Sequence, residues 1–202
     1  MKIFLLNNLL LLMVIITGCA QNPHDMDRKK NNLRENDPGE YPITKSEAEW
    51  KSQLKPMEFE VLRQAGTERP FTGETYATDK PGIYFSAASG QPLFVSDAKY
   101  DAGCGWPSFF EPIVDDAVYY RTDKKLGMIR TEIIDASTGS HLGHVFEDGP
   151  PPTGLRYCLN SAAMLFVEAG QPWPPLVEEY MNQHASQEEK QAVEDYMRQA
   201  GQ

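Results

Sequence analysis

Apolar residues recur with a helical period only near the two ends of the chain. After the apolar N-terminal stretch, a Thr44-x-x-Glu47 capping-box pattern precedes Trp50, and a second apolar run starts at Pro56 and stops before Gly66. Proline suits the first turn of a helix and glycine its end, because proline lacks an N–H and glycine tolerates a left-handed backbone. The pattern therefore predicts two short helices between residues 44 and 66.

A second helical region closes the chain after the Pro172-Trp-Pro-Pro175 break. Apolar residues return at helical spacing from Leu176 to Met181, and Ser186-x-x-Glu189 opens another periodic run. We expect two C-terminal helices. The acidic residues that crowd positions 178–202 are expected to form a solvated helical face.

Between Phe71 and Val167 the helical period gives way to short β-rich runs separated by turn residues. These runs cover residues 82–85, 93–95, 117–121, 128–134 and 163–167. The third and fourth are predicted to pair as a hairpin, because about five residues with one glycine connect them. We expect a mainly β fold, with antiparallel twisted sheets in one domain, short N-terminal helices and two C-terminal helices.

The first residues have the features of an export signal. Residues 3–16 are almost entirely apolar, and they are too few for the ~20 that a membrane-spanning helix needs. The following Ile16-Thr-Gly-Cys19 resembles the lipobox of bacterial lipoproteins. We expect a signal peptide over 1–18, a lipidated Cys19 anchored to a membrane and a flexible polar tether over 19–40. The location is then the bacterial cell envelope, facing the periplasm or the exterior, and Gln21 favours the outer membrane in a Gram-negative cell.

Composition and charge narrow the class of protein. The chain has 202 residues, of which 41% are hydrophobic, so it can bury the core of one domain. Its net charge of -10 opposes binding to nucleic acid, which requires a basic surface. We therefore exclude nucleic acid as a partner.

Two cysteines remain once the leader and Cys19 are set aside. Cys104 and Cys158 lie in short motifs rich in other functional residues, and His141 and His144 lie between them in sequence. A structural disulfide is the ordinary interpretation of two cysteines in an exported protein. The neighbouring residues favour thiol redox chemistry, because a reactive thiolate needs cations or hydrogen-bond donors such as Arg156 or the histidines.

Local spacing leaves several interpretations of these motifs open. On a strand, Arg156, Cys158 and Asn160 would share one face, which could equally be an ordinary solvent face. His141 and His144 would lie on opposite faces of a regular strand unless a bulge near Gly143 turned one of them. A histidine metal site is the competing hypothesis.

Trp106 has two interpretations as well. It lies between Gly105 and Pro107 and could form an apolar wall that accepts a methyl group. Alternatively, it is a core tryptophan that anchors a turn.

The order of the motifs resembles one enzyme family. They run Glu49-Trp50, Pro56-x-x-Phe59-x-Val-Leu-Arg63, Gly66-Thr-Glu68, Pro70-Phe-Thr-Gly73, Gly82-x-Tyr84, Pro92-Leu-Phe94, Gly103-Cys-Gly-Trp-Pro-Ser-Phe109, His141-Leu-Gly-His-Val-Phe146 and Gly154-Leu-Arg-Tyr-Cys-Leu-Asn-Ser161. This series closely resembles the B-type peptide-methionine (R)-S-oxide reductases over roughly residues 41–168. We accordingly expect a reductase domain over 41–170 and a helical extension over 171–202.

The resemblance implies a role for each site residue. Cys158 would attack the sulfoxide sulfur and become a sulfenic acid, and Cys104 would condense with it to form a disulfide that an external dithiol reduces. His141 and His144 would bind and protonate the sulfoxide oxygen. The remaining roles are methyl binding by Trp106 and orientation of the site by Arg156 and Asn160. The preference for the R epimer is also implied only by the family.

The sequence departs from the family at a metal site. Many members bind zinc through two Cys-x-x-Cys pairs, and the matching positions here are Ser86, Ser89, Asp135 and Thr138. Because no thiolate is left, tetrahedral zinc is not expected, and we expect no cofactor.

Partners and alternatives follow from the same features. We expect oxidised proteins as substrates and a thioredoxin-like domain as the reductant. The alternative is a lipid-anchored binding module with a structural Cys104–Cys158 disulfide and a histidine metal site. A redox sensor that turns over once is a third possibility.

Overall fold

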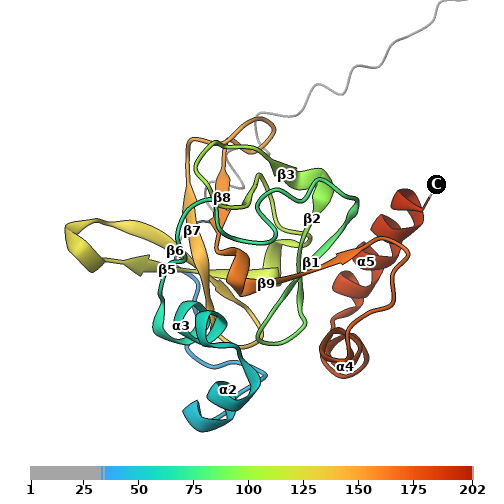
Figure 1. Cartoon of the computed structure of the whole chain (residues 1–202), viewed down its shortest axis with the longest axis horizontal. Coiled ribbons are helices and arrows are strands. Elements are labelled where there is room, and N and C mark those ends of the chain that lie inside the picture. The colour runs from blue at the N-terminus through green and yellow to red at the C-terminus, as the bar shows by residue number, and fades with distance from the viewer. Residues whose placement is uncertain (1–32, 34, 202) are drawn as a thin grey trace, which may run out of the picture.

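Two antiparallel sheets form the body of the protein, with helices at both ends of the chain (Figure 1). The computed structural model describes residue 33 and residues 35–201, so the predicted signal peptide and Cys19 lie outside the described residues. Within that part of the chain, no helix is both long and apolar enough to cross a membrane. The predicted fold class, mainly β with helices at both ends, is confirmed.

In the described part of the chain, nine strands make up the two sheets. They are β1 (Gly82–Ser86), β2 (Pro92–Val95), β3 (Lys99–Tyr100), β4 (Ser108–Phe109), β5 (Val118–Asp123), β6 (Arg130–Asp135), β7 (His141–Phe146), β8 (Arg156–Leu159) and β9 (Met164–Glu168). The order is β2-β1-β9 in the smaller sheet and β3-β4-β8-β7-β6-β5 in the larger one. The predicted hairpin is β5–β6, with a short 3-10 turn η3 (Lys125–Gly127) in its loop.

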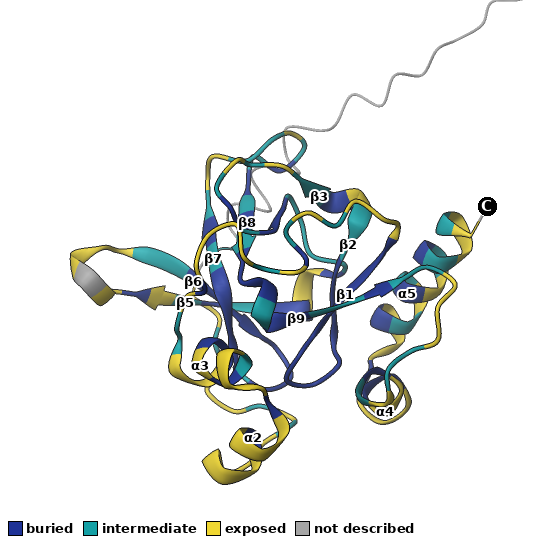
Figure 2. Ribbon diagram, viewed as in Figure 1, coloured by how far each residue is buried: buried dark blue, intermediate teal, exposed yellow. Residues whose placement is uncertain are grey.

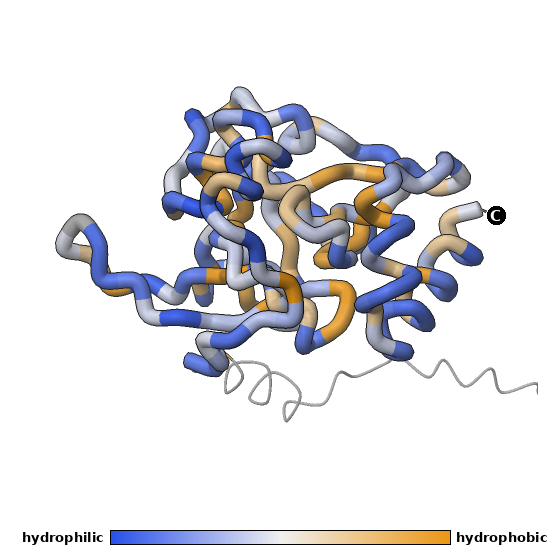
Figure 3. The backbone as a smooth tube through the Cα atoms, turned by 90° about the horizontal axis from the view of Figure 1, so that it is seen from below, coloured by the Kyte–Doolittle hydropathy of each residue, from blue (hydrophilic) through white to orange (hydrophobic). Residues whose placement is uncertain are grey.

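Aromatic side chains fill the space between the sheets. The rings of Phe94 and Phe109 stack with centroids 4.6 Å apart, and Tyr84 meets Phe109 edge to face at 4.9 Å. Such contacts add to the free energy gained by removing apolar area from water. Hydrophobic segments accordingly gather in the middle of the molecule, and hydrophilic segments lie mostly around them (Figure 3).

The N-terminal helices are α2 (Glu47–Gln53) and α3 (Pro56–Gln64). The capping box of α2 uses Ser46 and Glu49, so the predicted Thr44–Glu47 pair was wrong by two positions. The Ser46 hydroxyl accepts from the Glu49 amide, and the Glu49 carboxylate accepts from the Ser46 amide. The periodic sequence fits either frame, and burial of Trp50 against α3 accompanies the observed one.

The C-terminal helices are α4 (Pro175–Gln183) and α5 (Gln187–Ala200), and they lie beside the three-stranded sheet (Figure 1). Val177, Tyr180 and Val193 are buried against Ile83 and Phe85 of β1. The outer surfaces of both helices are exposed, as Figure 2 shows.

One acidic residue of α5 does not fit the predicted solvated face. Glu189 is only 4% exposed, and its carboxylate accepts hydrogen bonds from Gln91 and Tyr180. The expectation was wrong for this residue, because a capping-box glutamate at the start of α5 turns toward the sheet.

Residues 35–43, here called the strap, lie against the β5–β6 hairpin. Asn36 and Tyr120 exchange two hydrogen bonds, and the Ile43 amide donates to the Ser137 carbonyl at 2.9 Å. The predicted flexible tether extended to residue 40, but Glu35 and Asn36 hydrogen-bond to β5 and Asp37 forms an ion pair with Arg121 of that strand. Polar sequence alone could not show this, because backbone and carboxylate hydrogen bonds attach the strap.

Candidate active site

The two cysteines meet where β8 pairs with β4. Cys158 lies on β8 opposite Ser108 of β4, and Cys104 lies in the loop that leads into β4. Both are free thiols, and their Sγ atoms are 3.8 Å apart. Residues 54 positions apart in sequence are thus close enough for a disulfide to form after a small movement.

The thiols influence each other's ionisation. Burial acts to raise the pKa of Cys104, but hydrogen bonds to Ser108, Trp106 and Cys158, together with the Arg156 charge, outweigh it and lower that pKa. Burial and the neighbouring Cys104 raise the pKa of Cys158 to about 12. The pair therefore loses its first proton easily and its second with difficulty, because two thiolates this close repel each other.

A bulge in β7 brings His141 and His144 together. Ile133 of β6 pairs with Gly143, but the next residue, Ile134, pairs with His141, so Leu142 is the extra residue on β7. The imidazole centroids are 5.4 Å apart, and the bulge that the sequence allowed near Gly143 is present.

Glycine is required at position 143. A Cβ atom there would lie 2.1 Å from the Cys158 carbonyl oxygen, so only glycine lets β7 and β8 approach this closely. His144 then pairs directly with Cys158 across the two strands. The register, and not sequence proximity, joins the histidine motif to the cysteine motif.

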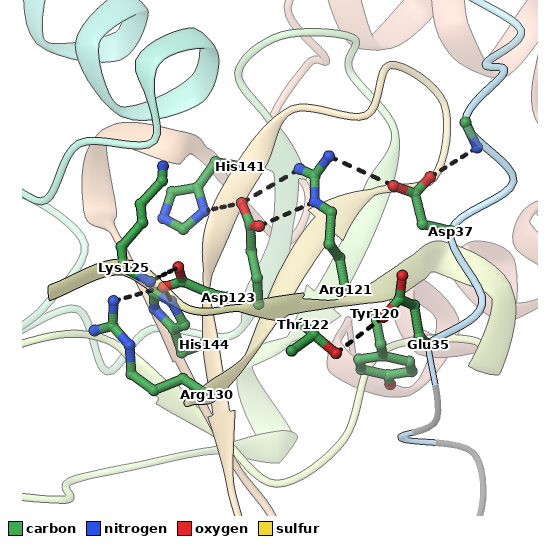
Figure 4. Close-up of polar contacts among 12 residues, drawn as sticks. Glu35, Asp37, Tyr120, Arg121, Thr122, Asp123, Lys125, Arg130, His141 and His144 are labelled. Carbon is green, nitrogen blue, oxygen red and sulfur yellow. Dashed lines mark hydrogen bonds and ion pairs between the residues drawn. The ribbon is translucent and has the colours of Figure 1, made fainter. Parts of the chain in front are cut away.

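Each histidine is held by a carboxylate from the hairpin (Figure 4). Nδ1 of His141 lies 2.7 Å from Oε1 of Glu132, and Nε2 of His144 lies 2.9 Å from Oδ2 of Asp123. A carboxylate can only accept, so these ring nitrogens carry the hydrogens. Neither carboxylate was among the predicted site residues, although their alternation with Arg121 and Arg130 on the predicted hairpin was a usable signal.

Arginines complete both carboxylate–histidine pairs. Arg121 donates to both oxygens of Glu132, at 3.0 and 3.3 Å, and Arg130 Nη2 donates to Asp123 at 2.6 Å. These contacts keep the carboxylates ionised: burial acts to raise the pKa of Glu132, and its hydrogen bonds to His141 and Arg121 outweigh burial and lower it. The imidazoles are therefore fixed in orientation.

The free nitrogens differ between the two rings. Nε2 of His141 is buried and has no hydrogen-bond partner in the described part of the chain. Burial lowers the pKa of His144 despite the Asp123 hydrogen bond, so its ring is neutral at pH 7 and Nδ1 is an acceptor. A buried polar atom without a partner marks a place for a polar ligand atom.

The other predicted site residues surround the thiols. Arg156 donates to both oxygens of Asp148, at 2.8 and 2.9 Å, and its guanidinium lies 4.4 Å from the ring centroid of Phe146. Trp106 is partly exposed, and its indole N–H donates to the Glu68 carbonyl at 3.2 Å. The ring lines a cavity of about 440 Å³ together with Tyr76 and Tyr100.

Asn160 lies beyond the strand that was expected to display it. β8 ends at Leu159, so the predicted face shared by Arg156, Cys158 and Asn160 stops one residue early. The Asn160 side chain is buried, accepts from the Glu68 amide at 3.0 Å and donates to the Leu142 carbonyl at 3.1 Å. It fixes the loop beneath Trp106 to the histidine strand.

The sequence of this chain is similar to those of known proteins that share one activity. The SelR domain model matches residues 54–168, more than half of the chain. A peptide methionine sulfoxide reductase MsrB of Agrobacterium fabrum is 56% identical over 124 residues, which cover 61% of this chain and 92% of the relative. The MsrB of Leptospira interrogans is 52% identical over 126 residues, 62% of this chain and 96% of the relative. The MsrB of Methanosarcina mazei is 53% identical, with 62% and 90% covered.

The chain belongs to the MsrB family. It is an oxidoreductase of the peptide methionine sulfoxide reductase type. The strap and both C-terminal helices lie outside the part that matches the family model.

Glu68, within the MsrB match, is a site residue without a predicted role. Its buried carboxylate accepts from the amides of Ser161 and Ala162, at 2.6 and 2.9 Å. Its own amide and carbonyl bind Asn160 and Trp106. Glu68 thus links the tryptophan loop to the residues that follow β8.

The four positions matching the MsrB zinc ligands lie together at the far end of β6. The carboxylate of Asp135 is fully buried and accepts from the hydroxyls of Ser86 and Ser89 and from the Thr138 amide. It also accepts from the amide and hydroxyl of Ser137. Three of these ligand positions carry neutral hydroxyls, a donor set that does not suit zinc, which prefers thiolate and imidazole. In residues 33 and 35–201, no cluster of three histidine, cysteine or acidic side chains could hold a metal ion.

Proposed function

We propose that this chain reduces methionine-R-sulfoxide in oxidised proteins, with Cys158 as the nucleophile and Cys104 as the resolving cysteine. The observation that carries the proposal is the 3.8 Å approach of the two thiols beside two carboxylate-bound histidines in an MsrB-family chain. The preference for the R epimer is part of this proposal, and its support is the resemblance to the B-type reductases.

The first step transfers the sulfoxide oxygen. The Cys158 sulfur attacks the sulfoxide sulfur and a bond forms between the two sulfur atoms. The oxygen then moves from the methionine sulfur to the cysteine sulfur as that new bond breaks, so methionine and a Cys158 sulfenic acid form. Negative charge develops on the oxygen during attack and must be neutralised by a proton. His141 supplies the donor once its ring is protonated, because Nδ1 is engaged by Glu132 and only Nε2 can face the oxygen.

The second step forms a disulfide. The Cys104 sulfur attacks the sulfenic sulfur, the S–O bond breaks and water leaves, carrying the hydroxyl and the thiol proton. Cys104 lies between Gly103 and Gly105, which both have positive φ. An external dithiol then reduces the Cys104–Cys158 disulfide and is itself oxidised to a disulfide.

The other residues bind and orient. Trp106 receives the methyl group of the substrate, because its indole is fixed by the Glu68 carbonyl beside the cysteine loop. The Arg156 charge acts to lower the pKa of Cys158 as well as that of Cys104, so it favours the nucleophilic thiolate against burial and the neighbouring Cys104, which raise the pKa of Cys158. Asn160 keeps the tryptophan loop and the histidine strand in register.

The enzyme uses no zinc. The buried Asp135 carboxylate joins the β1–β2 and β6–β7 turns, which a metal would otherwise connect. Equal activity and equal thermal stability before and after dialysis against a zinc chelator support this point. Loss of a stoichiometric zinc ion with a fall in stability contradicts it.

The chain is anchored in the bacterial envelope by acyl groups on Cys19, and it faces the periplasm or the exterior. The support is the lipobox-like Ile16-Thr-Gly-Cys19 after an apolar stretch. A cytoplasmic thioredoxin cannot reach that compartment, so a thioredoxin-like domain fed by electrons through the membrane is the proposed reductant. Incorporation of labelled fatty acid into the wild type and not into Cys19→Ala tests the anchor.

The test of function follows both epimers of a methionine-sulfoxide peptide with dithiothreitol. The wild type is expected to turn over the R epimer many times and the S epimer not at all, and Cys158→Ser neither. Without reductant, the wild type should lose two thiols per methionine formed, whereas Cys104→Ser should lose one and leave a sulfenic acid that dimedone traps.

Absence of turnover by a folded wild type on both epimers would overturn the proposal. A disulfide that persists in dithiothreitol would then favour a binding module with a structural bond. Turnover by Cys158→Ser would reassign the nucleophile.

A further inference from the structure

A line of alternating charges runs from His141 to the strap (Figure 4). His141 Nδ1 lies 2.7 Å from Glu132, whose carboxylate binds Arg121 at 3.0 Å, and Arg121 Nη1 forms an ion pair with Asp37 at 3.4 Å. Three of these side chains are largely buried, and Arg121 is the most exposed, at 38%. The line starts at the proposed proton donor and ends outside the residues that match the family model.

Asp37 is held firmly in this position. Tyr41 donates to Asp37 Oδ1 at 2.5 Å, and burial, together with this hydrogen bond, raises the pKa of Tyr41 to about 12, so the phenol keeps its proton. The strap is bound on either side of Asp37, by Asn36 to β5 and by Ile43 to the turn after β6. The aspartate is therefore fixed against the hairpin and does not simply meet Arg121 by chance at the surface.

The turn between β6 and β7 leaves room for Tyr41. Gly139 has a φ of +67°, and a Cβ atom there would lie 2.3 Å from the tyrosine ring. Any other residue would push the ring away and, with it, the hydroxyl that holds Asp37. The strap thus contacts both strand β5 and the turn between β6 and β7.

We propose that Asp37 is a positioning residue of the reductase, which fixes Arg121 on Glu132 and thereby keeps Glu132 aligned with His141. The inference rests on the proposed function, in which His141 donates a proton to the sulfoxide oxygen. It extends the active site beyond the family domain, to a strap that precedes it in the chain.

The physical reason is charge balance. A single carboxylate between an arginine and a histidine is attracted to both, and an unbalanced arginine draws it away from the ring. Asp37 offsets the Arg121 charge from the opposite side, so Glu132 remains available to His141. Hydrogen bonds between charged groups are stronger and more directional than neutral ones, which makes each contact in the line contribute to the orientation of the ring.

The test is Asp37→Asn in the full-length chain, beside the matched control Glu35→Gln. Glu35 is an acid of the same strap, and its carboxylate accepts from the Thr122 hydroxyl. Within the described residues, the ion pairs of Arg121 are with Asp37 and Glu132 and not with Glu35. Asp37→Asn should lower kcat on the R-sulfoxide peptide about tenfold with KM unchanged, because a charge-assisted contact is lost and the thiols and Trp106 are untouched. Glu35→Gln should behave as the wild type.

A double-mutant cycle separates positioning from a structural role. In a Glu132→Gln background the line is already broken, so Asp37→Asn should cause no further loss of kcat. Equal losses in both backgrounds, or an unchanged kcat of Asp37→Asn, overturn the inference. Should Asp37→Asn fail to fold, Tyr41→Phe removes only the supporting hydroxyl and should lower kcat about threefold, again only when Glu132 is present.

A spectroscopic measurement makes the inference independent of turnover. The nitrogen-15 and ring-proton signals of His141 should move in Asp37→Asn and stay in place in Glu35→Gln. This holds even if the wild type reduces neither epimer, in which case the proposed function fails and the structural link from Asp37 to His141 is still tested. Identical His141 signals in the wild type and Asp37→Asn contradict the link itself.

Discussion

The two ends of strand β6 use buried carboxylates in opposite ways. Near its start, Glu132 and the neighbouring Asp123 of β5 bind side-chain cations and imidazoles. At its last residue, Asp135 accepts five hydrogen bonds from neutral hydroxyls and backbone amides of two turns. The same strand thus carries an electrostatic site at one end and a structural knot, Asp135 with Ser86, Ser89, Ser137 and Thr138, at the other.

The two ends of β6 differ in whether their buried polar side-chain atoms have hydrogen-bond partners. At the active-site end, Nε2 of His141 and Nε of Arg130 are buried and unpaired in the described part of the chain, whereas the hydroxyl and carboxylate oxygens of the knot all have partners there. Unpaired buried groups cost free energy and are retained where a ligand satisfies them, while a fully satisfied network stabilises the fold. Function is therefore expected to respond at one end and stability at the other.

The largest expected effect is at the active-site end. His141→Gln removes the proton donor and should lower kcat on the R-sulfoxide peptide by a factor of about 100 or more, the usual contribution of a general acid. The free energy of unfolding should change only slightly, because Glu132 keeps its ion pair with Arg121. Steady-state kinetics and urea unfolding of the same preparation measure both quantities. A variant that unfolds readily but turns over normally when folded would contradict the division between the two ends.

The next effect is at the knot. Asp135→Ala removes the common acceptor of five donors and should lower the free energy of unfolding by about 3 kcal/mol or more, because buried donors are left unpaired. The kcat of the molecules that remain folded should not change. Urea unfolding measures the loss, and Asp116→Ala, an exposed acid just before β5, is the control, with an expected change within about 0.5 kcal/mol. An active-site defect in folded Asp135→Ala would show that the two ends are coupled through β6.

Much of this arrangement follows from local sequence, and part of it does not. The hairpin and the bulge at Gly143 were predictable because alternation and glycine are local signals. The partnership of His144 with Asp123 was not, since it depends on the register of three strands. Asn160 was misplaced because the end of β8 is set by the turn that follows it.

The contacts of the strap also could not be predicted from the local sequence. Residues 35–40 carry almost no apolar side chains, so composition predicts a flexible tether there. The hydrogen bonds of Asn36 to β5 and the ion pair of Asp37 with Arg121 hold this segment, and such contacts leave no periodic pattern. The resemblance to a family could not reveal it either, since that resemblance covers residues from about 41 and the family model matches from residue 54.

A smaller effect concerns pH at the active-site end. The pKa of His144 is lowered in the folded protein, mainly by burial, so the unfolded chain binds more protons as the pH falls below about 6.5, the usual value for histidine. The contribution of His144 to the free energy of unfolding is therefore fully present above about pH 6.5. It is lost as the pH falls toward the lowered pKa of His144 in the folded state. His144→Gln keeps a donor for Asp123 and should flatten this dependence between pH 6.5 and 5. Urea midpoints across this range provide the measurement, and a slope equal to that of the wild type would show that another group is responsible.

The smallest effect tests how far the knot extends. Gln91 accepts from the Ser137 amide in the knot and donates to Glu189 of α5, so the C-terminal helices are joined to the end of β6 by one buried side chain. Glu189→Gln places an amide group where an oxygen accepts from Ser186 or Tyr180, and should lower the free energy of unfolding by about 1 kcal/mol.

The matched control is Glu188→Gln, an exposed residue of the same helical turn, which should leave the urea midpoint unchanged. Because the line from Glu189 leads to the knot and not to the histidines, kcat should be the same in both variants. A lowered kcat in Glu189→Gln alone would mean that the C-terminal helices act on the active site through β6, and the two ends of the strand could no longer be treated as separate.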